Sequence, residues 1–249
     1  LAQAISVVLS LAVVLRRRSG ISLTKQDFRP DRGIMGKLLS IGVPVMLQDG
    51  FIQVSFIIIT IIANHRGLVD AAAVGIVEKI MSFMFLLPSS MLSTVSALGA
   101  QNIGAGKPER ARRTLWYAIA IATGIGLAIA IVMQHLADGM VGLFTPDALV
   151  AVAGGQYLRG YIWDSCFGGI QFSFSGYFCA KGKSGLSFLH NCLSILLVRI
   201  PGAYFGSKLF PQTLLPMGLA SAAGSLLSVI VCVIAYCVLT RREKAILEG

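Results

Sequence analysis

Asp164 stands in a long apolar stretch, 148–179, among residues that could help it to bind a cation. Tyr157, Tyr161, Asp164 and Gln171 are spaced i, i+4, i+7 and i+14, so a helix places them on one face. Ionisable side chains are costly in hydrocarbon and usually have a function there. A carboxylate flanked by phenols could hold Na⁺ through oxygen ligands, or bind a proton. This polar and aromatic helix face therefore predicts a cation-coupling residue at Asp164, with Tyr157, Tyr161 and Gln171 in a substrate cleft.

Asp49 is the second acidic candidate and lies in the apolar segment 38–62. Asp49, Gln53 and Phe56 share one helix face by their i, i+4 and i+7 spacing, and Gln48 directly precedes Asp49. The pattern predicts a second cation-coupling residue at Asp49, with Gln48 and Gln53 in the substrate cleft. The alternative is that the helix is loosely packed or begins elsewhere, which would leave Asp49 near the membrane interface.

Basic groups inside the apolar segments could contact anionic partners. Arg199 is the most central of them and is a further candidate for the substrate cleft. A purely structural alternative is an ion pair between Asp164 and either Arg159 or Arg199 that only holds helices together. The neighbours Glu78 and Lys79 point in different directions on a helix. Because long charged side chains can reach the interface, structural roles are favoured for both.

The composition excludes several classes of protein. The chain of 249 residues is 55% hydrophobic and only 13% charged, whereas soluble domains carry about a quarter charged residues. The net charge of +10 lies mostly in short loops, so nucleic acid is not an expected partner. The GKS sequence at 182–184 lacks the required glycine because Tyr177 occupies that position, so nucleotide hydrolysis, and enzymatic activity in general, is not expected.

An all-α, polytopic transmembrane bundle with six complete spans is the predicted fold. A span needs about 20 apolar helical residues. The predicted spans cover 38–62, 71–100, 115–133, 148–179, 186–205 and 214–239, within a bundle at 38–240. Residues 1–15 form the end of a preceding span, 16–37 a cytoplasmic linker and 241–249 a cytoplasmic tail.

The positions of the basic residues predict the orientation of these spans in the membrane. Most of the 21 lysines and arginines fall in segments 16–37, 107–113, 181–183 and 241–244, whereas the opposite loops hold only Arg66 and Lys208. Short cytoplasmic loops are enriched in lysine and arginine. Both flanks of the bundle are therefore predicted to be cytoplasmic, in a multi-pass protein of the cell membrane.

Four segments together resemble the multidrug and toxic compound extrusion (MATE) family, specifically its second six-helix half. They are IGVPVMLQ at 41–48, SALGAQNIGAGKPERARR at 96–113, AKGKS at 180–184 and LLVRIPGAY at 196–204. The resemblance implies twelve helices in two six-helix bundles around a central cleft that opens alternately to each side. On that analogy residues 1–15 end the sixth helix, and the first bundle, a necessary partner, lies upstream of this chain.

The resemblance also implies a function and site residues. Members of the family use Na⁺ or H⁺ gradients to expel organic, often cationic, compounds, and several carry acidic residues on the seventh and tenth helices. Asp49 and Asp164 are the acidic residues on the corresponding segments here. The expected partners are membrane lipid and a small organic cation. The expected coupling ion is Na⁺, with Asp164 as its ligand, or H⁺, and no other cofactor is expected.

Two other functions remain open at the level of sequence. A lipid-linked saccharide flippase of related architecture would use cationic cleft residues for a pyrophosphate, and Arg159, Arg199 and Lys79 could serve in that role. A membrane scaffold without transport activity, or an inactive truncated product, is a different class. The short loops argue against a scaffold because they leave little surface for partners.

Overall fold

A computed structural model describes residues 2–16 and 31–248. The chain divides into two compact units, residues 1–38 and 39–249. The first unit contains α1 (Ala2–Arg16) and the beginning of α2 (Arg32–Asn64). Most of the predicted linker, together with Leu1 and Gly249, lies outside the described residues.

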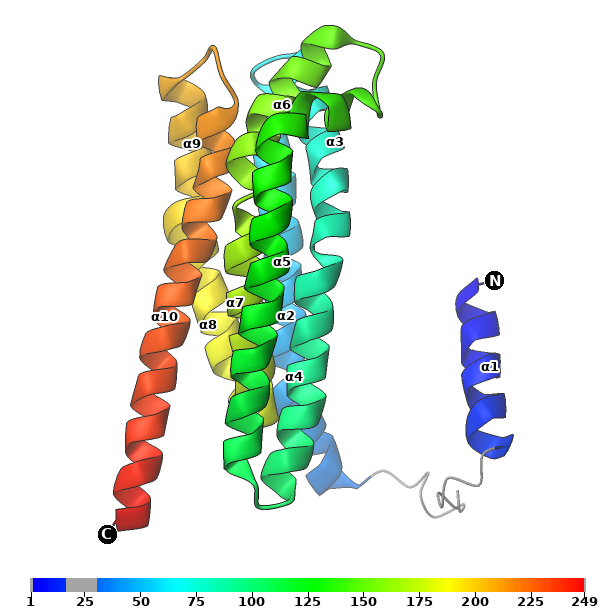
Figure 1. Cartoon of the computed structure of the whole chain (residues 1–249), viewed down its shortest axis with the longest axis vertical. Helices are drawn as coiled ribbons and strands as arrows, with labels where there is room; N and C mark the ends of the chain where they lie inside the picture. Colours follow the sequence, from blue (N-terminus) through cyan, green and yellow to red (C-terminus); the bar gives the residue numbers. More distant parts are fainter. Residues whose placement is uncertain (1, 17–30, 249) are drawn as a thin grey trace. The chain divides into compact units, whose positions relative to one another are not determined.

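The second unit is a bundle of long helices that run alternately up and down (Figure 1). After α2 they are α3 (Leu68–Met84), α4 (Leu86–Gly104), α5 (Pro108–Gly142), α6 (Ala148–Tyr161), α7 (Asp164–Ala180), α8 (Ser184–Ser194), α9 (Ile200–Leu209) and α10 (Leu215–Glu248). Residues Ile195–Arg199 form a π-helical segment that joins α8 to α9. No strand occurs in the two ranges that the structure describes, so the predicted all-α class is confirmed.

Helix α2 begins earlier than the predicted span at 38. The Oδ1 atom of Asp31 accepts hydrogen bonds from the backbone N–H groups of Gly33 at 2.6 Å and Ile34 at 3.0 Å. An aspartate that accepts from the first free N–H groups of a helix is a strong N-terminal cap. The helix therefore starts at Arg32, inside the segment that the sequence assigned to the linker.

Five helical segments within the described residues are long and apolar enough to cross a membrane. They are Arg32–Asn64, Leu68–Gly104, Pro108–Gly142, Ser184–Leu209 and Leu215–Glu243. The remaining predicted span, 148–179, corresponds to α6 and α7, which are shorter helices of 14 and 17 residues and are not among these five segments. Thirteen of the 17 residues of α7 are buried, including Asp164 and Gln171. A helix enclosed by other helices can be polar because few of its side chains meet lipid.

Three helical segments of the bundle, α3–α4, α6–α7 and α8–α9, are irregular near their middle. The α3–α4 segment is interrupted at Phe85, α6 and α7 are separated by Ile162 and Trp163, and the π-helical turn ends at Arg199. Prolines follow two of these sites, Pro88 and Pro201, and sharp bends in helices commonly occur at proline. The break before Asp164 contains no proline, so no residue pattern predicts it.

The turns divide between two ends of the bundle. We call the end that contains the α2–α3 and α9–α10 turns the Arg66 end, and the end that contains the α4–α5 and α7–α8 turns the Lys181 end (Figure 1). At the second end, Lys181 Nζ donates to both carboxylate oxygens of Glu243 on α10, at 2.5 and 2.7 Å. These bonds tie the α7–α8 turn to α10.

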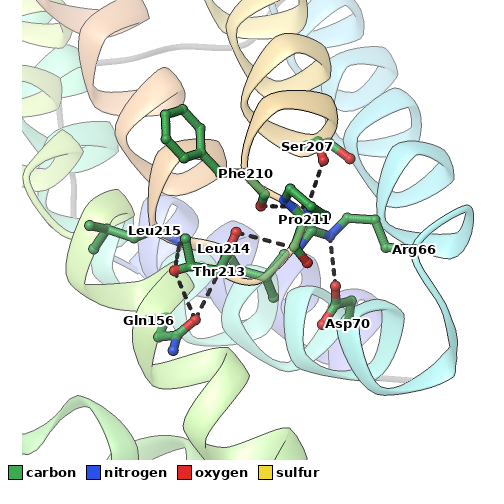
Figure 2. A network of polar contacts seen from close by, with 9 residues as sticks. All are labelled: Arg66, Asp70, Gln156, Ser207, Phe210, Pro211, Thr213, Leu214 and Leu215. Carbon is green, nitrogen blue, oxygen red and sulfur yellow. Dashed lines mark hydrogen bonds and ion pairs between the residues drawn. The ribbon is translucent and has the colours of Figure 1, made fainter.

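Arg66 connects three chain segments at its end of the bundle (Figure 2). Its Nε donates to Asp70 at 2.6 Å, Nη1 donates to the carbonyl oxygens of Ser207 and Phe210, and Nη2 donates to those of Pro211 and Thr213. The side chain is only 9% exposed. All five N–H donors of a guanidinium are therefore used, four of them on the last turn of α9 and the loop that follows.

We expect Arg66→Ala to destabilise the full-length protein by about 2 kcal/mol, because several carbonyls and Asp70 lose a charged donor. Arg66→Lys should be nearly as harmful, because an ammonium has three donors and lacks the planar geometry of the guanidinium. Thermal melting in detergent measures the effect. Lys208→Ala, which removes an exposed cation at the same end, is the matched control and should melt like the parent.

His190 joins three helices in the bundle interior. Its Nε2 lies 2.8 Å from Ser175 Oγ on α7, and its Nδ1 lies 2.5 Å from Ser228 Oγ on α10. The side chain is almost fully buried. Hydrogen bonds of this kind stabilise contacts between transmembrane helices.

Candidate functional site

A cavity of about 350 Å³ lies between α2, the α3–α4 segment, α7, the α8–α9 segment and α10. Five of the predicted site residues line it: Asp49, Gln53, Asp164, Gln171 and Arg199. Its apolar wall includes the rings of Phe56, Phe85 and Phe172. All three irregular helices contribute residues to this cavity, so the breaks in the helices occur around it.

Asp164 is the first residue of α7 and follows the two-residue break. Its side chain is fully buried, and neither of its carboxylate oxygens has a hydrogen-bond partner among the described residues. The N-terminus of a helix favours a negative charge. An unpaired buried carboxylate is nevertheless expensive. The geometry therefore leaves Asp164 able to accept a proton, a metal cation or a cationic group from the cavity.

Arg199 faces the same cavity from the end of the π-helical turn. One terminal nitrogen, Nη2, donates a short hydrogen bond to the hydroxyl of Tyr161. The guanidinium carbon lies 4.8 Å from the centre of the Phe56 ring, a distance at which the cation is attracted to the ring. Among the described residues Nε has no partner. The buried cation is thus held by aromatic groups.

The structural alternative for Asp164 was an ion pair with one of two arginines. Arg159 is not that partner, because its Nη2 lies 2.8 Å from Asp138 and its Nε donates to the carbonyl of Gln134. Within residues 31–248, Arg199 and Asp164 do not approach within the 4.0 Å of an ion pair. The pairing with Arg159 is therefore wrong, and Arg199 acts on Asp164 only at longer range.

The Asp49 face of α2 lies as predicted. Asp49, Gln53 and Phe56 all line the cavity, and the side chains of Asp49 and Gln53 are exposed. Asp49 lies in the middle of α2, far from the start of the helix at Arg32. Only four residues of α2 are buried, as in the loosely packed helix of the alternative. Asp49 is thus at the open side of the cavity, whereas Asp164 is at its buried side.

Three other predicted residues lie outside the cavity wall. Tyr157 and Tyr161 are fully buried behind it, with ring centres 5.5 Å apart. Gln48 is also buried, and its Oε1 has no hydrogen-bond partner in the described part of the chain. It points away from the Asp49 face because neighbouring residues on a helix differ by about 100° in direction.

The structure adds polar residues that sequence reasoning did not select. Asn191, Ser194 and Ser225 line the cavity, and Gln171 Nε2 donates to Ser225 Oγ at 3.1 Å. Single serines and asparagines in apolar segments carry no pattern that predicts which way they face. Glu78 is different, because an acidic residue inside a predicted span is a visible signal. The sequence favoured a structural role for it.

The MatE family model matches residues 44–205 of this chain. The chain is 30% identical over 115 residues to the probable multidrug resistance protein NorM of Xanthomonas axonopodis pv. citri, a match that covers 45% of this chain and 24% of that protein. It is also 30% identical over 128 residues to the multidrug resistance protein PmpM of Pseudomonas aeruginosa, which covers 50% and 26%. These relatives do not favour the saccharide flippase alternative.

Solved structures agree with the fold. A crystal structure described as MATE in the straight conformation matches with a TM-score of 0.84 and 18% identity, over 98% of this chain and 54% of that one. A variant of the Vibrio cholerae MATE transporter VcmN matches with a TM-score of 0.83 and 19% identity, over 93% and 52%. This chain therefore spans about half the length of the transporters it resembles. Since the family model matches well over half of its residues, the chain belongs to the MatE family.

Proposed function

We propose that the chain is the second half of a secondary efflux transporter that exchanges Na⁺ or H⁺ for organic, mainly cationic, compounds. The observation that carries the proposal is Asp164, a fully buried carboxylate without a hydrogen-bond partner among the described residues, in the wall of a cavity within a bundle of membrane-sized helices. Either the coupling ion or the organic cation could neutralise this carboxylate.

Competition for Asp164 would couple the two movements. One carboxylate cannot attract an inorganic cation and an organic cation fully at the same time, so loading the ion weakens binding of the drug. The drug must weaken binding of the ion by the same factor. Asp49 at the open side of the cavity would add attraction for a cation that enters, and the three phenylalanine rings would bind its apolar or cationic parts.

The cavity in this chain is one wall of the proposed binding site. Its volume, about 350 Å³, is at the lower end of the range for small-molecule pockets. A partner bundle facing α2 would enlarge and close it. We therefore expect no transport by residues 1–249 alone. The distribution of basic residues supports an arrangement in which the Lys181 end faces the cytoplasm and the Arg66 end faces outward.

Efflux of a fluorescent cationic dye from vesicles tests this function. The full-length protein is reconstituted, and a Na⁺ gradient and a pH gradient are imposed separately. Dye movement driven by one gradient would establish antiport and identify the coupling ion. If a folded protein responds to neither gradient, the proposal of cation-coupled antiport fails.

A further inference from the structure

A second cavity of about 360 Å³ lies between α2 and α3. Gln53, Phe56 and Ser82 line both this cavity and the central one, so the two adjoin along α2. On α2 its other wall residues, such as Thr60, lie closer to the α2–α3 turn than the residues that line the central cavity. On α3 the same is true of Glu78 and Lys79. The second cavity is therefore nearer the Arg66 end. A solute that enters from that end would meet it before the Asp164 cavity.

Glu78 is the acidic residue in the wall of this second cavity. Tyr157 Oη on α6 donates to Glu78 Oε1 at 3.3 Å. The ring of Tyr157 packs against that of Tyr161, whose hydroxyl accepts the hydrogen bond from Arg199. A continuous row of polar and aromatic side chains therefore leads from Glu78 to the guanidinium in the wall of the central cavity.

The charges in this row do not cancel. Glu78 and Asp164 carry two carboxylates, and both lie within electrostatic range of Arg199 and of each other. Tyr157 and Tyr161 are neutral hydrogen-bonding groups between them. Lys79, which also lines the second cavity, is exposed. With both acids ionised, the buried groups have a net charge of −1, and a low-dielectric interior strongly favours the uptake of one compensating cation.

We propose that Glu78 is a second cation-binding station, which takes the coupling ion from the Arg66 end and weakens drug binding at Asp164 through Arg199. This inference rests on the proposed antiport. While Glu78 is ionised, the positive charge of Arg199 is attracted to both carboxylates, so it neutralises Asp164 only in part. Once a proton or Na⁺ occupies Glu78, the guanidinium acts more fully on Asp164, and an organic cation there is held less tightly.

Ethidium binding to the purified full-length protein tests the station. Two quantities are measured: the dye affinity without coupling ion, and the factor by which Na⁺, or a lowered pH, weakens that affinity. Coupling factors between sites are typically about 5 to 150. Because the neutral amide mimics the ion-loaded carboxyl, we expect Glu78→Gln without coupling ion to bind the dye as weakly as the parent does with the ion, and the coupling factor to fall at least fivefold.

Lys79→Gln is the matched control, because it removes a charge of opposite sign from the same cavity. It should leave the coupling factor unchanged or raise it. An unchanged coupling factor in Glu78→Gln, or equal losses in Glu78→Gln and Lys79→Gln, would overturn the station. If Glu78→Gln does not fold, Glu78→Asp keeps the carboxylate one methylene shorter. It should alter the ion concentration for half effect while coupling persists, and an unaltered concentration would count against the station.

The failure of this inference can be distinguished from failure of the proposed function. If Asp164→Asn binds ethidium as well as the parent and supports efflux, the antiport mechanism itself is wrong. If Asp164→Asn behaves as expected and Glu78→Gln retains full coupling, only the second station is wrong.

Discussion

Asp164→Asn should abolish gradient-driven efflux by the full-length transporter. The amide is similar in size to the carboxylate but carries no charge, so neither the coupling ion nor the organic cation gains an electrostatic partner in the cavity. An ion pair of unit charges about 4 Å apart is worth about 4 kcal/mol at an effective dielectric constant of 20. Allowing for solvation, we expect dye affinity to fall on the order of 100-fold, as measured by fluorescence titration.

Asp138→Asn is the matched control for this experiment. Asp138 is also an acid in a helix of the bundle, but it is 46% exposed on its side chain and forms its ion pair with Arg159. An exposed pair contributes about 0–1 kcal/mol, so efflux should continue at close to the parent rate. Efflux by Asp164→Asn at the parent rate would remove Asp164 from the coupling role.

Gly218→Ala, which adds one methyl group, should destabilise the bundle strongly. A Cβ atom at position 218 would lie 2.3 Å from the carbonyl oxygen of Tyr157 and 2.8 Å from the backbone nitrogen of Tyr161. The contact is reciprocal, because a Cβ at Gly160 would lie 2.5 Å from the carbonyl oxygen of Leu215. Helices α6 and α10 therefore touch through their backbones, as small residues at the contact between two transmembrane helices allow.

The alanine must push these backbones apart, because neither can rotate away like a side chain. Overpacking of this kind costs about 1–3 kcal/mol or more, and we expect the upper part of that range. It would also displace α6, which carries the two tyrosines next to Arg199. Thermal melting of the full-length protein in detergent should show a clear loss of stability, accompanied by weaker dye binding.

Gly139→Ala provides the comparison, since nothing lies within 4 Å of a Cβ at that position in α5. Alanine is a better helix former than glycine by about 1 kcal/mol. This variant should therefore melt at or slightly above the parent temperature. Equal melting temperatures for Gly218→Ala and Gly139→Ala would contradict the close contact between α6 and α10.

Helical spacing correctly predicted which residues share one face where the helix is unbroken. Asp49, Gln53 and Phe56 line the cavity as their i, i+4 and i+7 positions require. The same reasoning was less successful for Tyr157, Tyr161 and Asp164. Ile162 and Trp163 interrupt the helix between these residues, and the tyrosines lie behind the cavity wall. A periodicity argument holds only as far as the helix remains regular.

The partners of buried charges could not be predicted in the same way. Arg159 and Asp164 are close in sequence, yet Arg159 pairs with Asp138 on α5. Glu78 looked like a side chain that could extend to the interface, but it accepts a hydrogen bond from Tyr157 on α6. Both outcomes depend on how each helix is rotated about its axis, and the packing of neighbouring helices sets that rotation.

Hydropathy and charge along the chain are enough to predict the class of this protein: a helical membrane bundle with its apolar segments in a defined order and its basic residues at one set of turns. These properties follow from transfer free energies that each segment carries independently of its neighbours. The packing of the helices, in contrast, is needed to see that Asp164 begins α7 beside a cavity, that Arg199 is held by aromatic groups and that Glu78 faces a second cavity. Those relationships arise between helices, where packing and not hydropathy determines which side chains meet.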